Sequence, residues 1–101
     1  MCKELDNFVE DVKRIYGDSL VKIILFGSRA RGDYSDDSDY DVMVLTSLKS
    51  FEKQKSEMID ASFYVDVTIN PIVQNNDFYD RWKKASPLYS NIEKDGEVLY
   101  E

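Results

Sequence analysis

The sequence of 101 residues contains no histidine, one cysteine, two prolines and four glycines. Without histidine, zinc sites and histidine-based acid–base catalysis are disfavoured. The single cysteine, Cys2, excludes an internal disulfide framework and is typical of a reducing cytoplasm, where we expect the protein to reside. No run approaches the roughly 18 apolar residues that a membrane span requires, and no secretory signal is apparent. We therefore expect no membrane association.

Positive charge is also scarce, because 13 lysines and arginines face 20 aspartates and glutamates, giving a formal net charge of -7. Nucleic-acid backbones attract basic surfaces, so direct nucleic-acid binding is not expected. An acidic surface suits hard divalent cations or a basic protein partner. The apolar share of 43% is typical of a globular chain. The length predicts one domain over residues 1–101.

The N-terminal half is predicted to alternate helix and strand. Apolar residues at helical spacing predict an amphipathic helix over residues 3–16. The run Val21–Phe26 is rich in β-branched residues and predicts a buried strand. Gly27-Ser28 then turns the chain, and Ser28 is placed to cap a short helix that extends to Arg31.

A polar loop over Asp33–Ser38 leads to a second predicted strand, Asp39–Leu45. We further expect a helix over about residues 48–61 and a third strand over Phe63–Ile69, which Asn70-Pro71 closes. Aromatic residues then predict another helix, which stops before a proline. The residues that define this helix and the short C-terminal segment after it are Phe78, Tyr79, Trp82, Pro87, Leu88, Ile92, Val98 and Leu99.

Three aspartates in the predicted strands are candidates for metal binding. Asp39 and Asp41 are two residues apart on one strand, so they project to the same side with Cα atoms roughly 6–7 Å apart. Mg²⁺ prefers carboxylates, water and substrate phosphates, and a pair of Mg²⁺ ions about 3.5–4 Å apart can hold the attacking and leaving oxygens of a phosphoryl displacement. Asp66 lies in an apolar run, and we expect it to be the third carboxylate or the base that accepts a proton.

A candidate phosphate site precedes the acidic pair. Gly27 lets the backbone approach a ligand, and the N–H groups and hydroxyl that begin at Ser28 favour an anionic phosphate. Arg29 and Arg31 are expected to offset triphosphate charge. Each feature alone is common. An isolated Asp-x-Asp is usually a solvated pair of loop acids, and Asp66 alone is equally consistent with a charge at a strand edge. The two arginines alone are consistent with exposed cations. Their combination in this order predicts a phosphoryl- or nucleotidyl-transfer site.

The ordered pattern is Gly27-Ser28, ten residues, Asp39-Tyr40-Asp41 and then Asp66 within Tyr64-Val65-Asp66-Val67. It resembles the nucleotidyltransferase superfamily related to DNA polymerase β. The local sequence Phe26-Gly-Ser-Arg-Ala-Arg-Gly32 is similar to that of the minimal nucleotidyltransferase group. The resemblance covers nearly the whole chain.

This resemblance implies an α/β (α+β) fold of the polymerase β type, with a small mixed β-sheet flanked by helices. It implies Mg²⁺-dependent transfer of AMP from ATP, with Gly27 and Ser28 at the triphosphate and Asp39, Asp41 and Asp66 at the metal. Members of the group commonly act as antitoxins that attach AMP to a tyrosine of a HEPN-domain RNase toxin. A hetero-oligomer with such a toxin is the expected assembly.

Two other functions remain open from the sequence. The protein could be a catalytically inactive antitoxin that neutralises its toxin by binding alone. It could instead be a nucleotidyltransferase for small molecules such as aminoglycosides, although such relatives usually carry an additional helical domain. The complete acidic triad favours catalysis over simple binding, and the minimal length favours a protein substrate.

Overall fold

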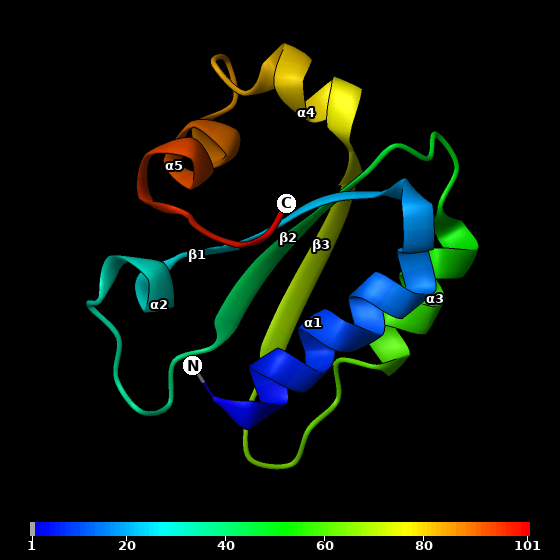
Figure 1. The fold of residues 1–101 in the computed structure, drawn as a ribbon. Helices are drawn as coiled ribbons and strands as arrows, with labels where there is room; N and C mark the ends of the chain where they lie inside the picture. Colours follow the sequence, from blue (N-terminus) through cyan, green and yellow to red (C-terminus); the bar gives the residue numbers. More distant parts are fainter. Residues whose placement is uncertain (1) are drawn as a thin grey trace.

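The computed structural model describes residues 2–101, in which a four-stranded sheet carries helices on both faces (Figure 1). The elements in chain order are α1 (Lys3–Tyr16), a short 3₁₀ segment η1 (Gly17–Ser19), β1 (Leu20–Phe26), α2 (Ser28–Arg31), β2 (Tyr40–Thr46), α3 (Glu52–Asp60), β3 (Ile69–Asn75), α4 (Asn76–Trp82), α5 (Pro87–Asp95) and β4 (Glu97–Tyr100). None of the helices in this part of the chain combines the length and the apolar character that crossing a bilayer requires.

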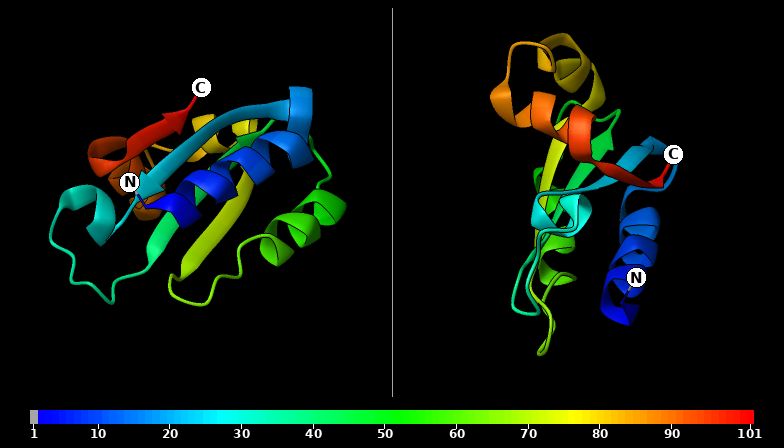
Figure 2. Two further views of the ribbon diagram at one scale, coloured as in Figure 1. Left: turned by 60° about the horizontal axis from the view of Figure 1, so that its bottom comes forward. Right: turned by 90° about the vertical axis from the view of Figure 1, so that its left-hand side faces the viewer.

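The sheet is mixed, with the strand order β3-β2-β1-β4. β1 pairs antiparallel with both β2 and β4, whereas β2 and β3 run parallel. Figure 2 shows the sheet between two layers of helix, with α1 and α3 on one side and α4 and α5 on the other. The expected fold class, a small mixed sheet flanked by helices, is confirmed.

The larger core lies between α1, α3 and one face of the sheet. The buried stripe of α1 repeats every three or four residues, as an amphipathic helix requires. Met58 of α3 is fully buried against the same cluster, whose strand residues include Val42 and Val44. The buried members of the α1 stripe are Leu5, Phe8, Val12 and Tyr16. This packing confirms the helix predicted over residues 3–16.

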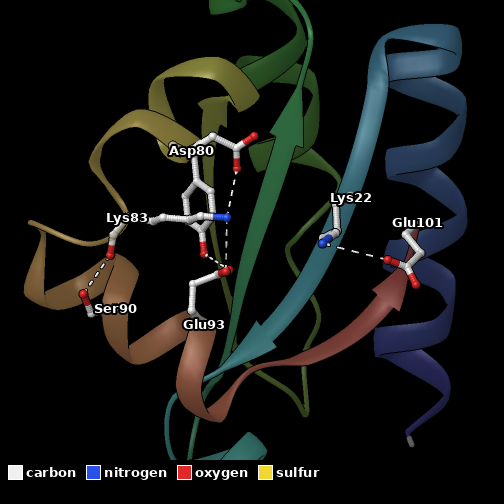
Figure 3. A network of polar contacts seen from close by, with 7 residues as sticks. Lys22, Asp80, Lys83, Ser90, Glu93 and Glu101 are labelled. Atoms are coloured by element: carbon white, nitrogen blue, oxygen red, sulfur yellow. Dashed lines mark hydrogen bonds and ion pairs between the residues drawn. The ribbon is translucent and has the colours of Figure 1, made fainter.

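The smaller core covers the opposite face of the sheet, where Tyr79 of α4 and Ile92 of α5 pack over Met43 and neighbouring residues. A polar network links α4, Lys83 directly after it and α5 (Figure 3). The Tyr79 hydroxyl donates to Glu93 at 2.7 Å, and Lys83 lies 3.5 Å from the same carboxylate. Asp41 lies two residues before Met43 on this face but outside the buried cluster.

The third strand does not lie where the sequence predicted it. β3 spans Ile69–Asn75, and residues 63–68 form a loop closed by a bridge between Phe63 and Thr68. Apolar residues occupy alternate positions in both segments, so alternation alone does not set the strand boundaries; the parallel pairing with β2 sets them. Pro71 lies inside the strand rather than closing it, because β3 is at the edge of the sheet, where a missing N–H is tolerated.

Two further boundaries differ from the sequence predictions. The third helix is shorter than the expected span of 48–61, because Leu48 enters the core from the loop that precedes α3. The C-terminal segment is a helix followed by an edge strand. Ser86 caps α5 by accepting a hydrogen bond from the Tyr89 N–H, and Pro87 occupies the first turn, where its missing N–H costs nothing. The Ser-Pro pair therefore starts a helix, in addition to following the end of α4.

Candidate active site

The Gly-Ser turn lies directly against the Asp-x-Asp strand. Phe26, the last residue of β1, pairs with Asp41 of β2, so the following residue, Gly27, is next to the Asp41 side chain. Gly27 has φ 76° and ψ -158°, a conformation that is essentially restricted to glycine. A β-carbon at this position would lie 2.4 Å from Oδ2 of Asp41. The absence of a side chain at Gly27 is thus what allows the carboxylate to approach the turn.

The short helix α2 begins immediately after this turn. Gly27 occupies the N-cap position, so Ser28 is the first helical residue and not the cap that the sequence predicted. The N–H groups of Ala30 and Arg31 both donate to the Gly27 carbonyl at 3.1 Å, which fixes the turn. Arg31 is exposed, lies 3.3 Å from Asp33, and is close enough to Asp41 to lower the pKa of that carboxyl. Arg31, at the C-terminal end of α2, therefore acts electrostatically on the Asp41 carboxylate.

Asp39, the residue directly before β2, reaches the same site. Its Oδ2 accepts a hydrogen bond of 2.8 Å from the side-chain amide of Asn70, which stands beside Asp41 in the parallel register of β2 and β3. Asn70 was predicted only to end a strand. Its role in holding the acidic pair becomes visible only once the register of β3 is known, and no signal in the sequence alone marks it.

The two aspartates differ in environment. Asp39 is exposed, whereas Asp41 is half-buried. Burial raises the pKa of the Asp41 carboxyl, and the negative charge of Asp39 raises it further, while Asn70 and Arg31 act in the opposite direction. A carboxylate that is partly desolvated next to a like charge is at higher free energy than one in water. A bound cation would relieve both penalties.

Asp66 does not join this pair. It is exposed in the loop of residues 63–68, and among residues 2–101 no three acidic or thiol side chains gather closely enough to hold a metal. Instead it lines a pocket of about 210 Å³, together with residues such as Ser38 and Thr68. The loop is nonetheless tied to the site, because the Tyr40 N–H donates to the Thr68 carbonyl at 2.9 Å.

The chain matches the protein family described as "Nucleotidyltransferase domain" over residues 5–94. The match includes the Gly-Ser turn, Asp39, Asp41 and Asn70, so it covers every part of the geometry described above. This chain belongs to the nucleotidyltransferase domain family.

Relatives of this nucleotidyltransferase occur in Methanocaldococcus jannaschii. One, named "Putative protein adenylyltransferase", is 33% identical over 98 residues, which cover 97% of this chain and 96% of the relative. A second protein with the same descriptive name is 41% identical over 73 residues, covering 68% of this chain and 74% of the relative. The first alignment extends over nearly the full length of both proteins, so the nucleotidyltransferase assignment applies to the whole fold.

Solved structures share this fold. A toxin–antitoxin complex with AMP-PNP superposes with a TM-score of 0.64 at 20% identity, covering 98% of this chain and 73% of that one. A nucleotidyltransferase structure from Sulfolobus solfataricus gives a TM-score of 0.55 at 21% identity, covering 100% of this chain and 89% of that one. A mutant of the toxin–antitoxin complex MntA-HpeT also gives 0.64, at 18% identity and with the same coverage as the first structure. At these identities the likeness establishes the fold.

Nucleotidyltransferases in general use a nucleoside triphosphate and a divalent metal, and the donor set of this site fits such a cation. Mg²⁺ is usually held by one or two carboxylates together with substrate phosphates, so it does not require an all-protein cage. Asp41 of β2 and Asp39, the residue before β2, supply two carboxylates, and no side chain of residue 27 covers Oδ2 of Asp41. The residues present therefore suit a hard cation that is completed by a triphosphate.

Proposed function

We propose that this nucleotidyltransferase is a Mg²⁺-dependent protein adenylyltransferase that moves AMP from ATP to a tyrosine of a HEPN-domain RNase toxin and thereby acts as its antitoxin in the cytoplasm. The observation that carries the proposal is the close approach of Gly27 to the Asp41 carboxylate, which supports a metal ligand beside the turn proposed to receive the triphosphate. The enzyme and its toxin form a hetero-oligomer in this proposal.

The transfer uses the chain's own residues in three roles. Asp39 and Asp41 hold one or two Mg²⁺ ions, which when bound neutralise charge on the transferring phosphate and orient it for in-line attack. Gly27 and Ser28 receive the triphosphate, and Arg31 offsets its charge from the exposed end of α2. The tyrosine oxygen bonds to the α-phosphorus, the bond from that phosphorus to the bridging oxygen breaks, pyrophosphate leaves and the phenolic proton is released.

Three observations support this assignment of substrate and partner. The relatives in Methanocaldococcus jannaschii are named as adenylyltransferases that act on proteins. Two proteins with the same fold are toxin–antitoxin complexes, one of them with the ATP analogue AMP-PNP. Finally, the formal net charge of -7 would attract a toxin whose RNA-binding surface is basic.

Intact-mass spectrometry of the toxin tests the proposal directly. The purified protein is incubated with ATP, Mg²⁺ and the candidate HEPN toxin. We expect the toxin to gain mass in steps of one AMP residue, on a tyrosine identified by fragmentation, and its RNase activity to fall in parallel. Omission of Mg²⁺ serves as the control, because the acidic pair alone does not neutralise the triphosphate.

Each alternative function predicts a different result. Loss of RNase activity without any gain in mass would show an antitoxin that acts by binding. Transfer of AMP to hydroxyl groups of aminoglycosides, with no change in the toxin, would show a small-molecule enzyme. Either result would contradict the proposal.

Asp66→Asn tests whether two carboxylates are sufficient. In the structure the Asp66 carboxylate stands apart from the pair, so we expect the variant to keep AMP transfer within about tenfold of the wild-type rate, a smaller effect than loss of a metal ligand produces. Mg²⁺ titrations of the rate should give nearly the same midpoint in both proteins. A collapse of activity comparable to that of Asp39→Asn would instead show that residues 63–68 rearrange and deliver a third carboxylate when nucleotide binds, as the sequence pattern predicted.

A further inference from the structure

The side chain of Arg29 is engaged in a different part of the site from the one that the sequence predicted. Its Nε and one terminal nitrogen donate to the Ser38 carbonyl at 3.2 and 3.0 Å, and the same terminal nitrogen lies 3.2 Å from the Asp36 carbonyl. The guanidinium carbon is 4.4 Å from the centre of the Tyr34 ring and 4.3 Å from that of Tyr40. Two aromatic rings and two backbone carbonyl oxygens therefore contact the guanidinium group.

These contacts place Arg29 on the opposite side of β2 from the acidic pair. Side chains alternate along a strand, so Tyr40 projects away from the face that carries Asp39 and Asp41. Tyr40 accordingly packs with the larger core on the α1 side. Because the Arg29 guanidinium stacks on the Tyr40 ring, it cannot at the same time extend toward a triphosphate held at Gly27.

We propose that Arg29 is a positioning residue that fixes the loop of residues 33–38 and, through it, the backbone from which Asp39 projects. The inference rests on the assignment of Asp39 and Asp41 as the metal-binding pair. Arg29 directly follows Ser28 in α2, and the Ser38 carbonyl belongs to the peptide group that joins Ser38 to Asp39. One side chain therefore connects the Gly27-Ser28 turn to the residues that lead into β2.

The loop has little else to hold it. Five of its six residues are aspartates or serines without apolar side chains to bury. Its internal hydrogen bonds all join Ser35 and Ser38, at 3.1 Å from the Ser38 N–H to the Ser35 carbonyl, 3.0 Å from the Ser35 N–H to the Ser38 hydroxyl and 3.4 Å between the two hydroxyls. A planar guanidinium supplies both a fork of donors and two faces for stacking, which a lysine ammonium cannot reproduce. This combination of hydrogen bonds and ring contacts is therefore specific to arginine.

Hydrogen exchange of the loop tests the inference without requiring activity. We expect the amides of Ser35 and Ser38 to exchange at least about tenfold faster in Arg29→Ala and Arg29→Lys than in the wild type, because the opening free energy of a local segment follows its contacts. Amides of the β1–β2 ladder should keep their protection, which shows that the fold is intact. Arg14→Ala, which removes an exposed arginine from α1, is the matched control. It should change neither the exchange of the loop amides nor that of the β1–β2 ladder.

Metal dependence provides the second measurement. Loss of a residue that supports metal ligands typically weakens metal binding by 10–100-fold, so we expect Mn²⁺ affinity, followed by electron paramagnetic resonance, to fall by at least about tenfold in both Arg29 variants. In the transfer assay the Mg²⁺ midpoint should rise while the KM for ATP stays nearly constant. Tyr34→Phe, which keeps an aromatic face, should resemble the wild type, and Tyr34→Ala should show a smaller form of the same defect.

Three results would overturn the proposal. Unchanged exchange of the loop in Arg29→Ala would show that the side chain does not hold it. Full recovery by Arg29→Lys would show that charge alone matters. A raised KM for ATP with an unchanged Mg²⁺ midpoint and unchanged Mn²⁺ affinity would make Arg29 a nucleotide contact. Because exchange and Mn²⁺ binding do not depend on the acceptor, failure of the proposed toxin substrate leaves this test unaffected.

Discussion

Gly27→Ala is expected to lower AMP transfer by at least about 100-fold, the effect that a displacement near 1 Å has on a preorganised site. The new β-carbon would lie 2.4 Å from Oδ2 of Asp41, so either the carboxylate rotates away or the turn shifts. Both changes separate the Asp41 carboxylate from the Gly27-Ser28 turn. The measurement is the steady-state rate of AMP transfer at saturating ATP and Mg²⁺, together with thermal unfolding to confirm that the variant folds.

Gly32→Ala is the control for backbone strain. Gly32 has φ 87°, yet a β-carbon there would meet no atom within 4 Å. Both substitutions force alanine to a positive φ, at a cost of about 1–3 kcal/mol each. We expect Gly32→Ala to lower the free energy of unfolding by about that amount while keeping most of the activity. Equal loss of activity in the two variants would show that strain in α2, and not displacement of Asp41, is responsible.

A double-mutant cycle isolates the contact itself. In an Asp41→Ala background the added methyl group at position 27 has space, so the stability cost of Gly27→Ala should shrink by about 1–3 kcal/mol, the range reported for relief of overpacking. Activity should not return, because Asp41 is absent. Additive costs in the cycle would contradict the close approach of Gly27 and the Asp41 carboxylate.

The sequence was sufficient to predict the parts of the site that depend on local pattern. Helical periodicity located α1, and a glycine after a β-branched run located the turn, because such signals act over a few residues. The structure then pairs β1 and β2 as adjacent antiparallel strands, with Phe26 opposite Asp41. Local patterns therefore located Gly27 and Asp41 individually, whereas their close approach depends on the register of these two strands.

Long-range register accounts for what the sequence did not predict. Alternating apolar residues continue from Phe63 to Val73, so two placements of the third strand satisfy the same pattern, and pairing with β2 selects the later one. That choice places Asn70 beside the acidic pair and leaves Asp66 in a loop. The stacking of Arg29 between two tyrosines is likewise a tertiary arrangement, which its position in the motif does not reveal.

Asp41→Asn is expected to reduce transfer by about 10³-fold or more, since loss of a metal ligand removes several kcal/mol of transition-state stabilisation and each 1.36 kcal/mol corresponds to tenfold in rate. Asp39→Asn should behave similarly. Asp18→Asn, which alters an exposed acid in the 3₁₀ segment η1, is a control of equal charge change and should retain activity. The rates of all three variants are compared by the appearance of AMP on the toxin.

Asp41→Asn should raise the stability of the fold, although it lowers the rate of transfer. Burial and the charge of Asp39 raise the pKa of Asp41 in the folded protein above its unfolded value, so the native state binds the extra proton and stability falls as pH rises through the interval between the two values. The penalty is then fully present at neutral pH. Asp41→Asn removes it, so the variant should melt at a higher temperature than the wild type at pH 7, and the difference should vanish as the pH falls below about 4.

Binding of Mg²⁺ should reverse the order of stability of the wild type and Asp41→Asn. Mg²⁺ with a non-hydrolysable ATP analogue binds the native wild type and stabilises it by about 2.7 kcal/mol at a hundredfold excess over the dissociation constant. Asp41→Asn lacks a ligand and should gain little under the same conditions, so the wild type becomes the more stable protein. If the variant were less stable than the wild type without Mg²⁺, or gained as much from it, Asp41 would be an ordinary structural carboxylate and the metal site would have to be sought elsewhere.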